Sequence, residues 1–123
     1  MTFRYRQATG EWFGPDGSLW ATGWSGHTAG YNNPAQQSVH GVGPLPVGRY
    51  TIGDPLDPPD HLGPVAMPLT PDAGNEMFGR GSFFIHGESA AHPAMSSDGC
   101  IILPRDVRER ICDEPDDGLE VVA

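Results

Sequence analysis

The sequence predicts a mainly β fold with one short helix near its C-terminal end. Seventeen glycines and thirteen prolines, about a quarter of the 123 residues, are spread along the whole chain without a repeat, and this density is typical of short strands joined by tight turns. Three Trp, three Tyr and five Phe supply bulky core side chains that disordered chains usually lack. A chain of this length can bury one core, so we expect a single domain over residues 1–123.

The N-terminal region is expected to form a strand followed by a β-hairpin. Residues 2–7 alternate apolar and polar side chains, which is the period of a half-buried strand. Residues 11–13 then lead into a strong turn signal at 14–18, and residues 19–22 return as a strand. Residues 23–34 are polar and rich in glycine, so we expect an ordered loop there.

Short apolar runs follow, separated by segments rich in glycine and proline, which is the pattern of strands joined by tight connections. We expect the loop at 70–81 to send Met77 and Phe78 into the core. The expected strands are 49–52, 64–69, 82–86, 101–103 and 119–122.

The only convincing helical stretch lies at 104–112, where a proline suits the first turn. Val107 and Ile111 lie four positions apart on one face of this helix. Asp106 and Arg110 have the same spacing on another face, so we expect an ion pair between them.

Charge and hydropathy exclude several classes of function. The formal net charge is −9 and the pI is near 4.7, whereas nucleic-acid binding needs concentrated Lys and Arg. No apolar run is long enough to predict a membrane span. Residues 1–10 lack the pattern of a cleavable signal peptide, so we expect synthesis in the cytoplasm without one.

The clearest chemical signal is a histidine and a cysteine that lie beside apolar runs. The run at 83–86 delivers His86 into a turn at Gly87, and Cys100 opens the second run behind residues 97–99, Ser-Asp-Gly. The connection between them is rich in Ala, Ser, Pro and Gly and can bring the two strand ends together. This arrangement indicates a cysteine nucleophile with a histidine base.

That pairing has a definite chemistry. A free thiol has a pKa of about 8.5, so a neighbouring imidazole is needed to form much thiolate at neutral pH. The backbone N–H groups of Gly99 and Cys100 are candidates to stabilise the oxyanion that forms when the thiolate attacks an amide. A carbonyl near Gly87 or Ser97 is a candidate to orient the imidazole of His86.

The other cysteine permits two interpretations. Cys112 follows the apolar Ile111 in the predicted helix, which favours a small packed side chain. A disulfide between Cys100 and Cys112 is the alternative that the sequence leaves open.

A set of motifs spread over the whole chain resembles one known family. The motifs are Gln7-Ala8-Thr9-Gly10, Gly23-Trp24-Ser25-Gly26, Asn32-Asn33-Pro34, Gly43-Pro44-Leu45-Pro46-Val47-Gly48-Arg49-Tyr50, Met77-Phe78-Gly79-Arg80, His86-Gly87-Glu88-Ser89 and Ser97-Asp98-Gly99-Cys100-Ile101-Ile102-Leu103-Pro104-Arg105. Together they resemble the type VI secretion L,D-transpeptidase effectors, compact relatives of the YkuD-type L,D-transpeptidases. The resemblance implies a compact YkuD-like β-domain with its cysteine at the mouth of a groove.

The resemblance also implies an activity and its partners. Cys100 and His86, with Ser97 and Gly99 in the same turn, are the implied catalytic residues. The expected reaction is transpeptidation or carboxypeptidation of peptidoglycan tetrapeptide stems through a thioester on Cys100. Such an effector is secreted and acts in the periplasm of target bacteria, so we expect a secretion-apparatus component and a cognate immunity protein as partners. No cofactor and no metal are expected.

Further residues near the motifs are candidates for binding the substrate. Arg80 and Arg105 have guanidinium groups that suit a stem-peptide carboxylate. The remaining histidines, His27, His40 and His61, lie in loops and are expected to have no chemical role. The other substrate-binding candidates are Gly87, Ser89, His92 and Asp98.

Two alternative functions remain open. The YkuD-type pattern has a histidine where this chain has Asp98, and a polar residue where it has Ile102 and Leu103, so a catalytically inactive module that binds cell wall or a partner is one alternative. A zinc amidase is the other, with ligands drawn from His86, His92, Asp98 and Cys100. No His-Glu-x-x-His or Cys-x-x-Cys spacing supports it.

Overall fold

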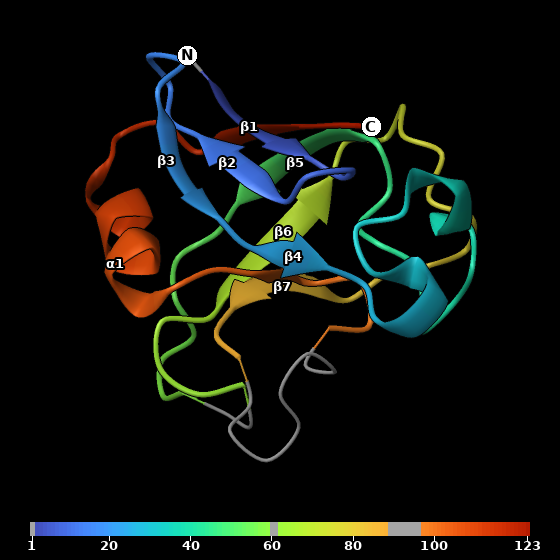
Figure 1. Ribbon diagram of the computed structural model, residues 1–123. Coiled ribbons are helices and arrows are strands. Elements are labelled where there is room, and N and C mark those ends of the chain that lie inside the picture. Colours follow the sequence, from blue (N-terminus) through green and yellow to red (C-terminus); the bar gives the residue numbers. More distant parts are fainter. Residues whose placement is uncertain (1, 60–61, 89–96) are drawn as a thin grey trace.

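The computed structural model describes residues 2–59, 62–88 and 97–123, which form a nine-stranded sheet with a short C-terminal helix (Figure 1). The mainly β fold expected from the sequence is therefore confirmed. The elements in chain order are β1 (Thr2–Arg6), β2 (Glu11–Phe13), β3 (Leu19–Thr22), β4 (Trp24–Ser25), the 3₁₀ turns Thr28–Gly30 and Pro34–Gln36, β5 (Gly48–Ile52), β6 (Met67–Pro71), β7 (Phe83–His86), β8 (Ile101–Ile102), α1 (Arg105–Asp113) and β9 (Gly118–Val122).

The sheet curves until its two edges nearly meet. Its strand order is β3-β2-β1-β9-β5-β6-β7-β8-β4, so the edge strands β3 and β4 are consecutive in the chain. Gly23 alone separates them, and a Cβ on this residue would lie 1.9 Å from the carbonyl oxygen of Ile102. Glycine is therefore required at the point where the chain passes from one edge of the sheet to the other.

Two of the sequence expectations for strands need correction. Residues 23–34 contain β4 and a 3₁₀ turn, where we expected only loop. The strand expected at 64–69 lies at Met67–Pro71 instead. Val65 has a φ of 58°, which lies outside the β region, so strand geometry begins only after it.

The helix α1 has the expected position but different side-chain pairing. The ion pair expected between Asp106 and Arg110 was wrong, because the Arg110 guanidinium lies 3.7 Å from the centre of the Trp20 ring. An aromatic face attracts a cation and covers the alkyl part of the arginine side chain. The i,i+4 ion pair of this helix is Arg105–Glu109, at 3.8 Å.

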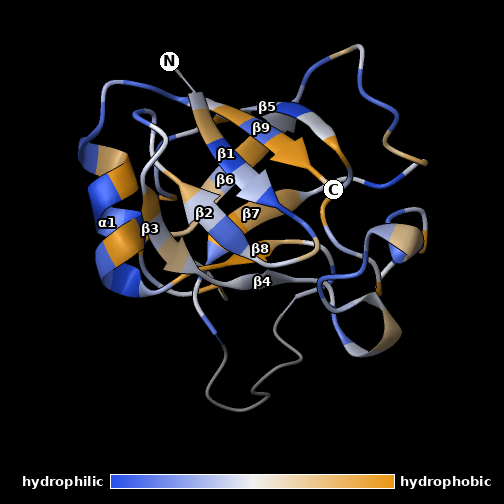
Figure 2. Ribbon diagram, turned by 45° about the horizontal axis from the view of Figure 1, so that its top comes forward, coloured by the Kyte–Doolittle hydropathy of each residue, from blue (hydrophilic) through white to orange (hydrophobic). Residues whose placement is uncertain are grey.

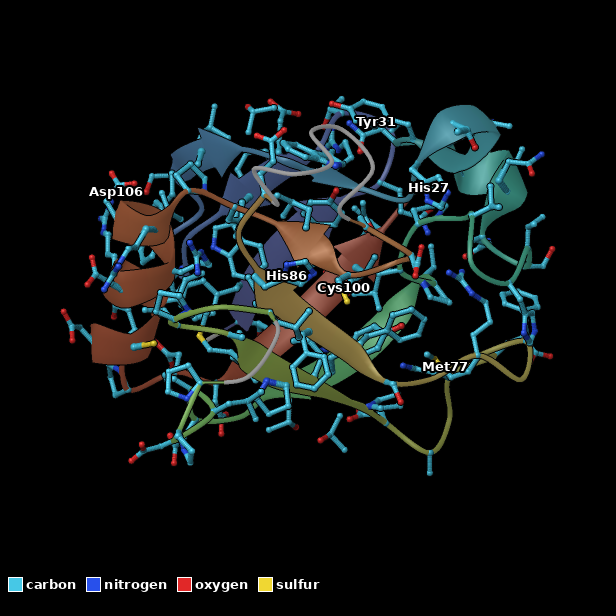
Figure 3. The ribbon with its side chains drawn as sticks, turned by 90° about the horizontal axis from the view of Figure 1, so that it is seen from below. His27, Tyr31, Met77, His86, Cys100 and Asp106 are labelled. Atoms are coloured by element: carbon cyan, nitrogen blue, oxygen red, sulfur yellow. The ribbon has the colours of Figure 1, made fainter. Side chains whose placement is uncertain are left out.

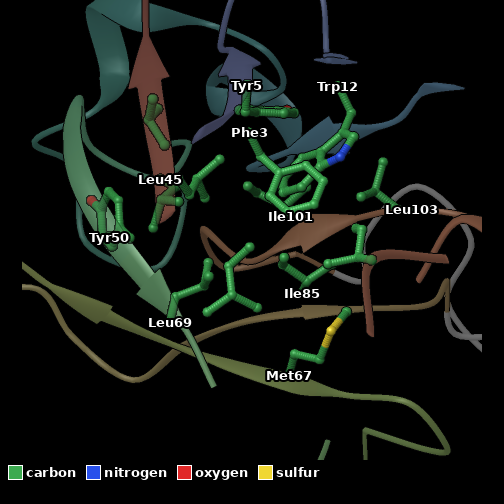
Figure 4. Packing of buried hydrophobic residues seen from close by; sticks show 14 of the residues in the cluster. Phe3, Tyr5, Trp12, Leu45, Tyr50, Met67, Leu69, Ile85, Ile101 and Leu103 are labelled. Atoms are coloured by element: carbon green, nitrogen blue, oxygen red, sulfur yellow. The ribbon is translucent and has the colours of Figure 1, made fainter. Parts of the chain in front are cut away.

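The core fills the inside of the curved sheet (Figure 4). In β1, Phe3 and Tyr5 are fully buried while Arg4 and Arg6 are exposed, as the alternating pattern predicts. The apolar side of α1 closes one flank of the core, and its polar side faces solvent (Figure 2). Met77 packs against the core as expected, whereas Phe78, also expected there, is half-buried and does not belong to the core cluster.

Cys112 differs from its expected packing. Its side chain is exposed on α1, and its Sγ lies 3.4 Å from Sδ of Met67. Both Cys112 and Cys100 are free thiols, so the disulfide alternative does not describe this structure. Within the residues that the structure describes, no helix is long and apolar enough to cross a membrane.

Candidate active site

Parallel pairing of β7 with β8 brings His86 and Cys100 to the same face of the sheet. Ile85 pairs with Ile101 and His86 with Ile102, and both Ile85 and Ile101 are fully buried in the core. Because side chains alternate along a strand, His86 and Cys100 point to the opposite face. Figure 3 shows their side chains next to one another, viewed from outside the sheet.

The protonation of the His86 ring is set by its neighbour. Its Nδ1 lies 2.8 Å from the carbonyl oxygen of Gly87, and a carbonyl can only accept a hydrogen bond. Nδ1 therefore carries the proton, and in the neutral ring Nε2 is the nitrogen with the basic lone pair. The imidazole itself is 5 % exposed. This tautomer is the one that a general base requires.

The Cys100 thiol is protonated at neutral pH in the resting protein. Burial raises its pKa to about 11, an effect that the backbone N–H of Phe84, 3.3 Å from Sγ, only partly offsets. The carboxylate of Asp98 raises the pKa further and the Arg80 guanidinium lowers it, each by less than burial does. Nucleophilic attack by Cys100 therefore depends on a base that removes the proton.

The turn before Cys100 is held together by the hydroxyl of Ser97. This buried Oγ donates to the carbonyl of Cys100 and accepts from the N–H groups of Gly26, at 2.9 Å, and Gly99, at 3.1 Å. Gly99 has a φ of 124°, and a Cβ there would lie 2.5 Å from both Arg80 and Phe83. The turn thus requires glycine at position 99.

This network changes the role expected for Gly99. Its N–H already donates to Ser97 Oγ, so it is not an open oxyanion donor in this structure. The Cys100 N–H instead interacts with its own Sγ, whose pKa it lowers. Ser97 acts here as the scaffold of the turn.

Arg80 is a second scaffold of the same turn. The side chain is 8 % exposed, and its guanidinium lies over the Phe83 ring. The carboxylate-binding role expected for Arg80 is not supported, because backbone carbonyls occupy the guanidinium. They are those of Gln37, Gly43, Pro44 and Asp98, at 2.6–3.0 Å from Nη1 or Nη2.

We expect Arg80→Met to lower the free energy of unfolding by about 2–4 kcal/mol, because four buried or partly buried carbonyls lose their donor while the volume of the side chain is largely kept. Urea unfolding measures the loss. The matched control is Arg105→Met, which removes an exposed guanidinium and is expected to change stability by about 0.5 kcal/mol or less. Equal losses in the two variants would contradict a structural role for Arg80.

His27 belongs to the site, although we expected no role for it. Its Nδ1 lies 2.7 Å from the carbonyl oxygen of Ser97 and 3.6 Å from the carboxylate of Asp98. The Asp98 side chain is 80 % exposed, so it is open to solvent at the rim of the turn. Ser25 is a further residue that we missed, since its Oγ donates to the carbonyl of Gly99 at 2.9 Å. Both follow from the antiparallel pairing of β4 with β8, and the only sequence signal was the Gly-Trp-Ser-Gly motif at 23–26.

A cavity of about 340 Å³ lies beside the end of β7. Gly87 and Arg105, two of the expected substrate-binding residues, both line it, together with Trp24 and Glu88. Arg105 is 60 % exposed and has a long contact, 3.8 Å, with Glu109. Its guanidinium therefore remains accessible to a ligand. Ser89 and His92, the other expected binding residues, lie outside the described residues, as does His61.

A buried arginine supports the wall of this cavity. Arg108 donates from Nε to the carbonyl of Leu103, and from Nη1 to the carbonyls of Pro64 and Val65, at 2.7–3.1 Å. A Cβ on Gly87 would lie 2.7 Å from its Nη2, so glycine allows the close approach. Arg108 thus ties the loop at Pro64 and Val65 to the end of β8, and it packs beside Gly87, the residue after His86.

Comparison with protein families identifies the chain. Residues 20–115 match the model of the Tlde1 domain. The chain belongs to this family, that of the type VI secretion L,D-transpeptidase effectors. No curated protein and no solved structure matched the chain. The match includes His86, Cys100 and the turn at residues 97–99 of this Tlde1 domain.

The zinc alternative gains no support from the described part of the chain. No group of three His, Cys, Asp or Glu side chains gathers there in an arrangement that would hold a metal ion. His92, one of the ligands considered for zinc, lies outside the described residues.

We expect the pH dependence of stability to report the buried thiol. A thiol whose folded pKa is raised from its ordinary value of 9.0 to about 11 keeps its proton longer in the folded state than in the unfolded state. Its contribution is therefore present below pH 9 and lost as the pH rises from 9 to 11, by about 2 kcal/mol.

Urea unfolding at pH 8 and pH 10.5 measures this loss. Burial also raises the pKa of Tyr5 and Tyr50, so Cys100→Ala, which keeps both tyrosines, is the reference. A decrease in stability that is the same in Cys100→Ala and the unchanged protein would contradict the assignment to Cys100.

Proposed function

We propose that this Tlde1-domain protein is a cysteine L,D-transpeptidase or L,D-carboxypeptidase that acts on the tetrapeptide stems of peptidoglycan. The observation that carries the proposal is the parallel β7–β8 pair, which places Cys100 beside a His86 ring whose Nδ1 is fixed by the Gly87 carbonyl. Membership of an L,D-transpeptidase-type effector family agrees with it.

The proposed acylation uses these two side chains. His86 Nε2 takes the thiol proton of Cys100, and Sγ attacks the carbonyl of the third residue of the stem. The tetrahedral intermediate collapses as the imidazolium of His86 gives its proton to the amine of the leaving D-residue. A thioester to Cys100 and a free D-amino acid result.

The thioester then reacts with a second nucleophile. His86 takes a proton from an incoming amine or water, which attacks the thioester carbonyl, and returns a proton to Sγ as the thiol leaves. An amine gives exchange or cross-linking, and water gives a shortened stem. The cavity that Gly87 and Arg105 line begins at the residue after His86, although His86 and Cys100 themselves do not line it, and the Arg105 guanidinium suits the carboxylate of the terminal D-residue.

The proposal extends to where the protein acts and what it binds. We place its action in the periplasm of target bacteria, after secretion with the help of a secretion-apparatus component. An immunity protein in the producing cell is expected to cover the Cys100 face. Family membership supports an antibacterial effector of the type VI system.

One observation favours a second function. Cys100 is half-buried and the pKa of its thiol is raised to about 11, which is the condition of an unreactive cysteine. An inactive module of the same fold that binds cell wall or a partner protein is therefore the alternative.

Mass spectrometry of purified tetrapeptide muropeptides separates the two functions. We expect the unchanged protein to release the terminal D-alanine, and to replace it when another D-amino acid is supplied. Cys112→Ala is the matched control, since it removes the other free thiol, which is exposed and lies on α1; it should act like the unchanged protein. Unaltered muropeptides after prolonged incubation would favour the inactive module.

A further inference from the structure

A second concave surface lies away from Cys100, on the outer face of strands β1, β9 and β5. It encloses about 580 Å³. Strand register builds its floor, because Arg4 and Arg49 each pair with Glu120 across neighbouring strands and so share one face with it. We call this surface the arginine groove. Its lining residues are Thr2, Phe3, Arg4, Arg6, Phe13, Gly14, Pro15, Asp16, Gly17, Arg49 and Glu120.

The groove holds its guanidinium groups in place. Glu120 accepts from Nε and Nη2 of Arg4, at 3.1 and 2.9 Å, and from Nη2 of Arg49 at 3.4 Å. Arg4 and Arg49 nevertheless remain 56 % and 64 % exposed. Arg6 is exposed as well, and no ion pair engages it within the described part of the chain. A single carboxylate, that of Glu120, therefore pairs with two of the three accessible arginines of the groove.

The charge of the groove is opposite to that of the rest of the molecule. Its three arginines, with Glu120 and Asp16, carry a net +1, so the remainder of the chain carries −9 − 1 = −10. Of the other four arginines of the chain, two are buried against carbonyls, one is stacked on a tryptophan ring, and one is exposed at the cavity beside β7. Arg80 and Arg108 are the buried pair, Arg110 is the stacked arginine, and Arg105 is the exposed one.

We propose that the arginine groove binds carboxylates of the peptidoglycan stem peptides and holds the protein on the wall while a different stem occupies the Cys100 site. This inference rests on the proposed function. Stem peptides carry free carboxylates, and a protein with a net charge of −9 is repelled by such a polymer everywhere except at a basic surface. The planar guanidinium matches a carboxylate in two parallel hydrogen bonds.

The position of the groove fits this role. Strands β1 and β5 lie at the top of Figure 1, whereas His86 and Cys100 are seen from below the molecule in Figure 3. A stem bound in the groove therefore leaves the catalytic face open. Two sites on one polymer raise the effective concentration of substrate at the second site. Phe13 and Pro15 add apolar surface beside the arginines for the uncharged parts of the ligand.

Co-sedimentation with purified sacculi at low salt tests the groove directly. The assay uses Cys100→Ala, which cannot turn over the wall, and adds Arg6→Gln/Arg49→Gln. This pair removes two cations but keeps both hydrogen bonds from Arg4 to Oε1 of Glu120. We expect binding to weaken by on the order of tenfold, from the loss of two charge-assisted contacts, and to disappear from sacculi whose carboxylates have been amidated.

The matched control is Ala35→Glu/Ser38→Glu in the same background. Both positions are exposed in the segment around Pro34–Gln36, outside the groove, and the double change lowers the net charge by the same two units. We expect this control to retain at least half of the binding that Cys100→Ala shows. Equal weakening in the two double variants would mean that net charge alone decides binding and would overturn the proposal.

Other outcomes also overturn it. One is undiminished binding to amidated sacculi; another is failure of the Cys100→Ala protein to bind unmodified sacculi. A third is tight binding of poly-glutamate that depends on Arg6 and Arg49, while substitution of these two residues leaves binding to sacculi unchanged. That result would assign the groove to an acidic protein partner. Thermal unfolding checks that the variants are folded.

The proposed function is tested separately on soluble tetrapeptide muropeptides. In the protein with Cys100 intact, Arg6→Gln/Arg49→Gln should leave the turnover rate of these soluble muropeptides unchanged. The same double variant should lower the turnover rate on intact sacculi when the sacculi are at limiting concentration. Sacculus binding through the groove without turnover of muropeptides would support the proposed role of the groove and reject the proposed enzymatic function. Turnover of muropeptides, together with sacculus binding that does not depend on the groove, would support the enzyme and reject the role of the groove.

Discussion

Cys100→Ala should abolish turnover of tetrapeptide muropeptides, with a loss on the order of 10⁴-fold or more, because no other group at the site can form the thioester. The fold should survive, since the Cys100 side chain lies on the outer face of the sheet and is absent from the buried core cluster. Mass spectrometry of the products measures activity, and circular dichroism checks the fold. Full activity in Cys100→Ala would remove the thiol mechanism.

His86 should show its role in two measurements. His86→Ala is expected to lower the turnover rate by on the order of 10²–10⁴-fold, the usual contribution of a general base. It should also slow alkylation of Cys100 at neutral pH, because the pKa of about 11 leaves little thiolate without a base. Alkylation of the exposed Cys112 in the same molecule is the internal reference. An unchanged ratio of Cys100 to Cys112 labelling would contradict proton transfer to His86.

A third large effect concerns the choice of substrate. Peptidoglycan stems contain L,D and D,D amide bonds, which differ in chirality on the side of the attacked carbonyl. We expect tetrapeptide stems to lose or exchange their terminal D-alanine and pentapeptide stems to stay intact, with rates that differ by on the order of 100-fold or more. A displacement of about 1 Å at the reacting atoms is enough to cause such a difference.

The rigidity of the catalytic turn is the physical reason for this discrimination. Ser97 Oγ makes three hydrogen bonds within the turn and to Gly26, and Arg80 bonds the carbonyl of Asp98, so Cys100 cannot shift to follow a substrate of the wrong chirality. Parallel incubations with purified tetrapeptide and pentapeptide muropeptides measure the two rates. Rapid cleavage of the D-Ala–D-Ala bond, with tetrapeptides untouched, would overturn the assignment.

The sequence by itself determined the fold class and singled out His86 and Cys100 as the candidate reacting groups. Alternation along β1 buries Phe3 and Tyr5, and the apolar runs beside a histidine and a cysteine are strands in the structure. These features are legible in sequence because each depends on neighbours a few positions away, which set the side-chain period of 2 or 3.6. The chemistry available to each side chain then follows from its residue type.

Only the tertiary structure decided how the catalytic turn is held. Its supports are contacts between residues about 20 to 74 positions apart: Ser25 with Gly99, His27 with Ser97, and Arg80 with carbonyls from two loops. No local period encodes such contacts, because they follow from the pairing of a two-residue strand, β4, with β8. The hydrogen bond from the Gly99 N–H, an expected oxyanion donor, to the Ser97 hydroxyl could not be predicted for the same reason, since this hydroxyl points inward only once the turn is folded against Gly26.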